Sequence, residues 1–275
     1  MQNKTVKQAS KIQLPSDHLS PTQINMYWRC PMQYYFRYVC GYKNPPVVAM
    51  IEGGSHHFAF EDDNLFKIKT GKNRGAKHLA SVFADDFNTK QKELPKNVWK
   101  CAGEKKDDVI RRGIAIQKTY SKDFAGFVLP KFAEKKVEFK VGEINVLGYI
   151  DVCGQIDDHG KRSGAWDYKI TSKRKPQDEI DSSIALAHYG WASIDLLKLG
   201  KKMPTVGLIT IRKQQCDITL QETVVTPERI KWYRSQVASV ANAISLGAFP
   251  TRNPVGWECS AKFCGYFNKC RGKCK

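Results

Sequence analysis

The stretch that decides the fold is Val146–Ile170, VLGYIDVCGQIDDHGKRSGAWDYKI. Apolar and polar residues alternate up to Asp151, a polar turn covers Gln155–Gly160, and an apolar and aromatic run follows. This pattern predicts two β-strands joined by a turn. Because successive side chains of a strand point to opposite faces, we expect Asp167 and Lys169 to share one face.

Asp151 can lie beside Asp167 and Lys169 if the two strands pair around the turn. Two carboxylates and one ammonium then meet at a single spot. Carboxylates this close resist joint ionisation unless a divalent cation lies between them. For a motif this short, an ordinary hairpin with exposed charges is the alternative interpretation.

The residues Gly148-Tyr149-Ile150-Asp151, followed by Asp167-Tyr168-Lys169, resemble the G-x-I-D … D-x-K core of the PD-(D/E)XK nucleases, in particular their RecB/AddB-like branch. The resemblance implies that Asp151 and Asp167 hold Mg²⁺ or Mn²⁺. It also implies that Lys169 orients the attacking water or stabilises the pentavalent phosphorus. The expected catalytic residues are therefore Asp151, Asp167 and Lys169.

The rest of the chain fits an α/β fold, a mixed central sheet flanked by helices as in restriction endonucleases. A third strand is expected before the hairpin, then a helix, two strands that pair as a hairpin, and a last helix. Their predicted ranges are Ala133–Val141, a helix from Ser182 or Ser183 to Gly200, Thr205–Arg212, Asp217–Val225 and a helix from Thr226-Pro227 to Leu246.

Five segments are expected along the 275 residues. Residues 1–18 form a flexible lead-in, 19–62 carry N-terminal helices, 63–130 form a basic helical insertion, 131–249 are the nuclease core and 250–275 are a cysteine-rich tail. The sequence has neither a long apolar run nor an apolar N-terminal signal region, so we expect a cytosolic protein with no membrane partner.

A capped helix begins near Leu19, in LSPTQINMYWRCPMQYYFRYV. Ser20 is the expected N-cap, Gln23 completes a capping box, and Cys30-Pro31 interrupts the helix. Core packing is the default explanation for its aromatic residues. The segment nevertheless resembles the C-P segment of iron–sulfur RecB-like nucleases, which implies that Cys30 is the first cluster ligand.

A histidine motif follows in Ile51–Glu61, IEGGSHHFAFE. A histidine among phenylalanines is usually structural. The family has a G-x-x-x-H-x-x-x-E pattern here, whose histidine reaches the metal; Gly53 and Glu61 place His57 in that register, with His56 as the alternative. Glu138, on the expected third strand, is a second-rank candidate for the same metal.

The tail WECSAKFCGYFNKCRGKCK holds Cys259, Cys264, Cys270 and Cys274. Clustered thiols in a reducing compartment indicate a soft metal, and these four could bind zinc unaided. The ending resembles phage-encoded RecB-like exonucleases, which implies a [4Fe–4S] cluster held by Cys30, Cys259, Cys264 and Cys270, with Cys274 spare. The remaining cysteines are isolated, and we expect small buried apolar side chains at Cys40, Cys101, Cys153 and Cys216.

Charge favours a polyanionic partner, because 45 Lys and Arg face 27 Asp and Glu, a formal charge of +18. Lys173 and Arg174, just after the central hairpin, are candidate DNA contacts. So is Tyr189, which matches the tyrosine of a family motif whose preceding glutamine is replaced here by Ala185. His188 is the candidate to compensate for the missing amide.

The leading hypothesis is a metal-dependent DNA exonuclease that binds DNA without reading its sequence and serves recombination, repair or processing. The chain shows no helicase motif, so a helicase or recombination protein is an expected partner. Two alternatives stay open. One is a catalytically inactive nucleic-acid-binding module of the same fold, and the other is a zinc-stabilised adaptor.

Overall fold

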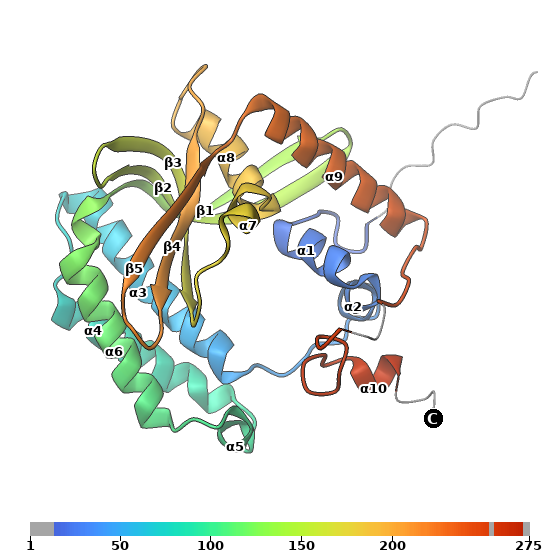
Figure 1. Ribbon diagram of the computed structural model, residues 1–275, viewed down its shortest axis with the longest axis horizontal. Helices are drawn as coiled ribbons and strands as arrows, with labels where there is room; N and C mark the ends of the chain where they lie inside the picture. Colours follow the sequence, from blue (N-terminus) through green and yellow to red (C-terminus); the bar gives the residue numbers. More distant parts are fainter. Residues whose placement is uncertain (1–13, 253–255, 272–275) are drawn as a thin grey trace, which may run out of the picture. The chain divides into compact units, whose positions relative to one another are not determined.

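A five-stranded sheet forms the centre of the computed structural model, which describes residues 14–252 and 256–271 (Figure 1). The strand order is β1-β2-β3-β4-β5. Strand β2 is antiparallel to β3, β3 is parallel to β4, and β4 is antiparallel to β5, so the predicted mixed sheet is confirmed. The strands are β1 Val128–Val141, β2 Ile144–Asp157, β3 Lys161–Thr171, β4 Thr205–Arg212 and β5 Ile218–Val224.

Helices precede, interrupt and follow the strands. The N-terminal half contains α1 Pro21–Arg29, α2 Pro31–Tyr34, a π-helical turn Tyr35–Val39, α3 Val48–Thr70, α4 Ala76–Lys90, α5 Val98–Ala102 and α6 Lys106–Asp123. The C-terminal half contains α7 Gln177–Asp181, α8 Ile184–Leu196, α9 Pro227–Ser245 and α10 Phe267–Cys270. Among the helices of the described ranges, none combines the length and apolarity needed to cross a bilayer.

The chain divides into two compact units. The first comprises Met1–Lys43, Glu138–Leu147 and Arg234–Lys275, so far as these are described, and the second comprises Asn44–Val137 and Gly148–Tyr233. Strands β1 and β2 each contribute residues to both units. The N-terminal segment 1–13, the first part of the expected lead-in, lies outside the described residues.

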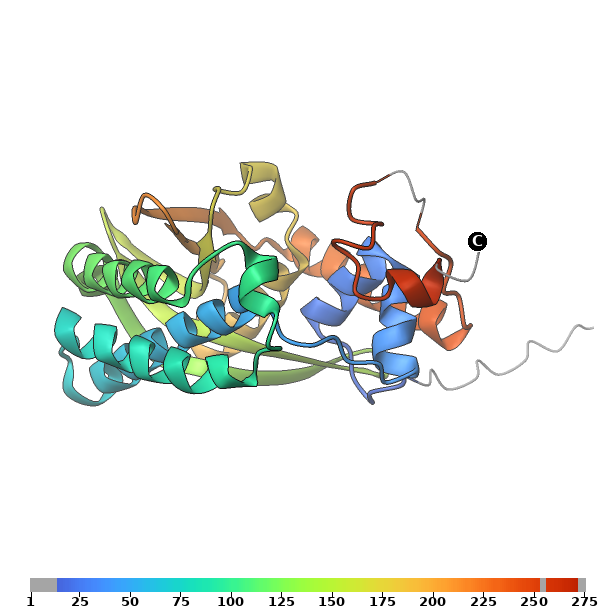
Figure 2. The same ribbon diagram turned by 90° about the horizontal axis from the view of Figure 1, so that it is seen from below.

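The core of the second unit lies between the sheet and a layer made of α3, α4 and α6, which lie side by side in both views (Figures 1 and 2). Helix residues and alternate strand residues form one buried cluster, which includes Phe60, Leu79, Ile116, Tyr120, Val152, Trp166, Tyr168 and Ile209. Burying each large apolar side chain stabilises the fold by about 1.5–3 kcal/mol. The basic stretch expected as an insertion therefore supplies one face of the core.

Helix α8 covers the opposite face of the sheet. Gly190 of α8 approaches Val206 of β4 so closely that a Cβ on the glycine would lie 3.0 Å from the valine Cγ1. Val206 and Ile209 point to opposite faces of β4, because their positions differ by three, an odd number. Ile209 belongs to the cluster under α3, α4 and α6, so α8 packs on the other side.

The first unit gathers the N-terminal helices and the C-terminal residues. Ser20 and Gln23 form the predicted capping box at the start of α1. Helix α1 ends at Arg29 and α2 begins at Pro31, as the Cys30-Pro31 pair predicts, because proline has no N–H to continue the helix.

Candidate active site

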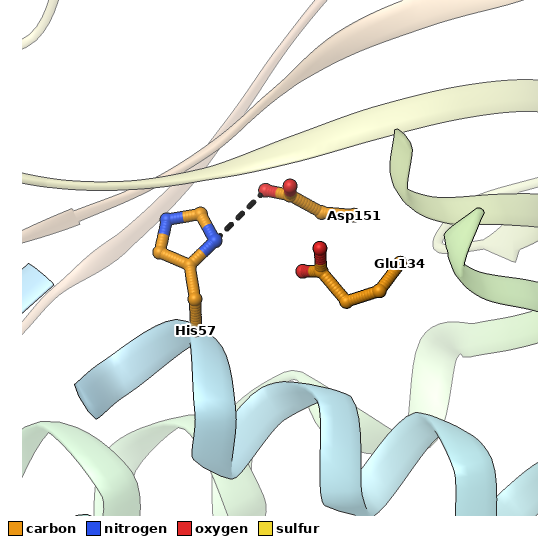
Figure 3. Close-up of side chains that lie close together, drawn as sticks. All are labelled: His57, Glu134 and Asp151. Atoms are coloured by element: carbon orange, nitrogen blue, oxygen red, sulfur yellow. Dashed lines mark ion pairs between the residues drawn. The ribbon is translucent and has the colours of Figure 1, made fainter. Parts of the chain in front are cut away.

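Three potential metal ligands from three elements of the second unit converge (Figure 3). His57 comes from α3, Glu134 from β1 and Asp151 from β2, and one donor atom of each lies within 4.8 Å of the others. His57 Nδ1 is 3.2 Å from Asp151 Oδ2. One imidazole nitrogen and two carboxylates suit a divalent cation such as Mg²⁺ or Mn²⁺.

Asp167 and Lys169 of β3 join this group. The β2–β3 register pairs Val152 with Trp166, so continuing it by one residue sets Asp151 opposite Asp167. Lys169 Nζ is 2.5 Å from Asp167 Oδ2, as expected for two side chains on one face. The sequence prediction that these residues meet therefore agrees with the geometry.

The backbone of the D-x-K motif also holds the first acid. The N–H of Tyr168 donates to Asp151 Oδ2 over 2.8 Å. Asp151 is buried, and this bond together with His57 fixes the direction of its carboxylate. A ligand that is held before the cation arrives loses less conformational entropy on binding.

The electrostatics of the group favour a bound cation. Burial, and secondly the charge of Asp151, raises the pKa of Asp167 to about 6. Burial and the same neighbour raise the pKa of Glu134 to about 7. Burial opposes the charge on His57, but its hydrogen bond to Asp151 outweighs this and raises the pKa. A divalent cation would relieve the repulsion that these carboxylates share, so the residues fit a metal site.

His57, and not its neighbour His56, faces the acids. His56 is fully buried, its ring stacks on Phe83 at 4.3 Å, and its Nδ1 lies 2.8 Å from Nε2 of Gln117. Burial lowers the pKa of His56 well below its ordinary value. His56 is a core residue, and the register set by Gly53 and Glu61 selects the histidine that the structure brings to Asp151.

The acid that β1 contributes to the candidate metal site is Glu134, whereas the sequence suggested Glu138. Glu138 is exposed, belongs to the other compact unit and is not part of the group. Glu134 has a positive φ of 44°, which interrupts the regular alternation of β1 and re-aims its side chain. Glu134 and Glu138 are four residues apart, so a period of two places both on one face of a regular strand, and sequence reasoning considered only Glu138. Tertiary packing decides which of the two acids reaches Asp151.

Tyr189 of α8 lies close to the acids. Burial, followed by the charges of Asp167 and Asp151, raises its pKa. Four residues earlier stands Ala185, which has no amide to offer. Tyr189 is therefore a polar group that α8 presents to the site.

His188 does not reach the surface, so the expectation that it contacts DNA is not supported. Its ring is fully buried, and its Nδ1 lies 2.7 Å from the hydroxyl of Tyr233. A Cβ on Gly148 would lie 2.5 Å from its Nε2, which explains the glycine of the G-x-I-D motif. Lys173 and Arg174 are exposed, and Arg174 pairs with Asp217 at 2.9 Å.

Four cysteines of the first unit line one cavity: Cys30, Cys259, Cys264 and Cys270. Burial raises the pKa of Cys270, and its three partners add smaller contributions. Four thiols around one space are the donor set of a tetrathiolate metal site, for iron–sulfur or zinc.

The other cysteines lie elsewhere. Cys153 is buried as expected, whereas Cys40 and Cys216 are half-buried, the latter packed against the core of the second unit. Cys274 and the side chain of Cys101 lie outside the described residues.

Comparisons with known proteins identify a family and a similar fold. The family model of the PD-(D/E)XK nuclease superfamily matches residues 18–271. A crystal structure of a "Putative exonuclease" from Eubacterium rectale superposes with a TM-score of 0.54 at 13% identity, covering 89% of this chain and 87% of that one. At this identity the likeness concerns the fold alone. No curated protein sequence matches the chain.

Proposed function

The chain belongs to the PD-(D/E)XK nuclease superfamily, and we propose that it is a metal-dependent DNA exonuclease of the RecB/AddB-like kind. The observation that carries the proposal is the convergence of His57, Glu134 and Asp151 beside the Asp167–Lys169 pair. A protein that only binds DNA gains nothing from buried carboxylates that repel one another.

In this proposal His57, Glu134, Asp151 and Asp167 hold Mg²⁺ or Mn²⁺. A bound divalent cation supplies an activated water and neutralises charge on the phosphate that is attacked. Lys169 orients that water and stabilises negative charge on the phosphate. Tyr189, beside the carboxylates, helps to position the strand.

The formal charge of +18 supports a DNA substrate held through its phosphates, with Lys173 and Arg174 among the contacts. The cavity lined by Cys30, Cys259, Cys264 and Cys270 supports a [4Fe–4S] cluster that ties the α1–α2 region to the C-terminal residues. We further propose that this phage-type enzyme works in recombination or repair beside a helicase or recombination protein.

The test uses end-labelled single- and double-stranded DNA and a circular DNA of the same sequence, with Mn²⁺, Mg²⁺ or EDTA. The wild type should shorten linear DNA only when a metal is present. Asp167→Asn and Lys169→Gln should lose cleavage while DNA binding in EDTA persists. Asp157→Asn, an exposed acid on β2, is the matched control and should keep full activity. Equal cleavage by the wild type and the two site variants, or none by the wild type, would refute the proposal.

A further inference from the structure

A second polar recess in the second unit is assigned no role by the proposed reaction. We name it the lysine pocket; Lys131 of β1, Gln155 of β2, Ser163 of β3, and Lys198 and Lys202 after α8 line it. No Asp or Glu is among the described residues that line it. Three lysines therefore line one recess whose described lining has no carboxylate, which is the composition of an anion site.

The pocket is built from four separate elements. Lysines that follow a helix often do no more than offset the partial negative charge of its C-terminus. Here Lys131 comes from a strand instead, and Gln155 donates to Ser163 across the hairpin at 3.1 Å. The loop after α8 is fixed by its own backbone bonds, from Lys198 N to Asp195 O at 3.2 Å and from Lys202 N to Leu199 O at 3.1 Å.

The hairpin places the pocket on the same face as the acids. Gln155 pairs with Ser163 in the β2–β3 register, and Asp151 lies four residues before Gln155 on β2. Residues an even number apart on a strand share a face, and four residues span about 13 Å. The pocket and the candidate metal site therefore lie along one surface of the sheet.

The length of α8 gives, independently, the same distance between the candidate metal site and the lysine pocket. Tyr189 lies beside the acids, and the pocket begins eight residues later, at Leu197. Eight residues of helix span about 12 Å. The edge strand β1 also runs from one site to the other, with Glu134 at the acids and Lys131 at the pocket.

We propose that the lysine pocket binds a backbone phosphate of the DNA strand about two nucleotides from the phosphate that is cleaved. Phosphates of one strand are spaced along the backbone by about twice the 3.4 Å that each nucleotide adds along a duplex axis, so a distance of about 12–13 Å corresponds to two steps. Lysines act on phosphate as point charges, so the pocket would grip any sequence and set where the strand lies relative to the metal. The inference rests on the proposed function, because it takes DNA as the substrate.

The test measures binding without cleavage. Fluorescent (dT)16 is titrated in EDTA over a range of KCl concentrations with the wild type and the Lys198→Gln/Lys202→Gln variant. The slope of log K against log salt should become shallower by about 0.7, the value for one phosphate neutralised on a single strand. The matched control is Lys72→Gln/Lys77→Gln, which removes two exposed lysines of the same unit and should leave the slope unchanged.

A second measurement uses (dT)3, which is too short to span both sites. Its affinity, read by competition, should be the same for the wild type and the pocket variant. An unchanged slope on (dT)16, an equal change in the control variant, or an equal loss on (dT)3 would overturn the inference. A wild type that binds (dT)16 but never cleaves DNA would contradict the proposed nuclease function and leave this comparison intact.

Discussion

Glu134→Gln gives the sharpest test of the metal site, because the variant should change stability in opposite directions with and without metal. In the metal-free protein the pKa of Glu134 rises from its ordinary 4.5 to about 7, first through burial and then through Asp151. Taken at face value, this shift corresponds to about 3 kcal/mol, and solvent screening of a half-exposed group reduces it to about 1 kcal/mol.

The sign follows from proton linkage. Between pH 4.5 and 7 the folded protein binds the proton of Glu134 more tightly than the unfolded chain does, so stability is lost as the pH rises across this range and is fully lost above it. In EDTA at pH 8, Glu134→Gln should therefore be more stable than the wild type by about 1 kcal/mol, or about 2–4 °C in Tm. At pH 4, where Glu134 is largely protonated in both the folded and the unfolded state, the two proteins should melt together.

Manganese should make the wild type more stable than Glu134→Gln, which reverses their order in EDTA at pH 8. A ligand at a hundredfold excess over its Kd stabilises a protein by about 2.7 kcal/mol, which is about 5–11 °C for a chain of this size. The wild type should gain this shift, and Glu134→Gln, which lacks one ligand, should gain much less. Thermal melts at pH 4 and 8, with EDTA or Mn²⁺, measure both effects, and Glu138→Gln on the same strand is the control. If Mn²⁺ raised the Tm of both proteins equally, Glu134 would not be a ligand.

Three further predictions concern packing and the cysteine cavity. Gly148→Ala should lower stability by about 1–3 kcal/mol in urea denaturation, because its Cβ would meet the buried ring of His188 at 2.5 Å; a smaller loss would mean that the ring moves aside. Cys30→Ser should remove bound iron and its visible absorbance from anaerobically purified protein, whereas Cys40→Ser, outside the cavity, should keep both; zinc in colourless wild type would contradict the cluster. Tyr168→Phe removes a buried hydroxyl that accepts a hydrogen bond, leaves its donor unpaired and should cost about 1–3 kcal/mol; an unchanged urea midpoint would argue against that bond.

Much of the fold was predictable because its signals are local. Strand alternation placed β4 at Thr205–Arg212, the bounds that the structure has, and capping chemistry placed the start of α1 after Ser20. The spacing of Asp167 and Lys169 is also local, because residues two apart on a strand always share a face. Each of these predictions needed only neighbouring residues.

The features that could not be predicted depend on contacts between residues that are far apart in the sequence. Whether a histidine belongs to a core or a site is decided by the ring next to it, here Phe83 for His56. His188 was expected to compensate for the amide that the family motif has where this chain has Ala185, but its ring is buried against Gly148 and Tyr233. Sequence spacing predicts on which side of a helix a residue lies. Only tertiary packing decides whether another element covers that side.

The pairing of Lys169 with Asp167 limits what the lysine can do. Burial opposes its charge, but Asp167 and then Asp151 outweigh this effect and raise the pKa of the ammonium. A lysine with a raised pKa is protonated at neutral pH and has no lone pair with which to take a proton from water. In the proposed reaction its contribution is therefore positional and electrostatic: it would donate hydrogen bonds and hold positive charge near the phosphate. The D-x-K spacing supports this role directly, because the acid two residues earlier on the same face keeps the ammonium charged.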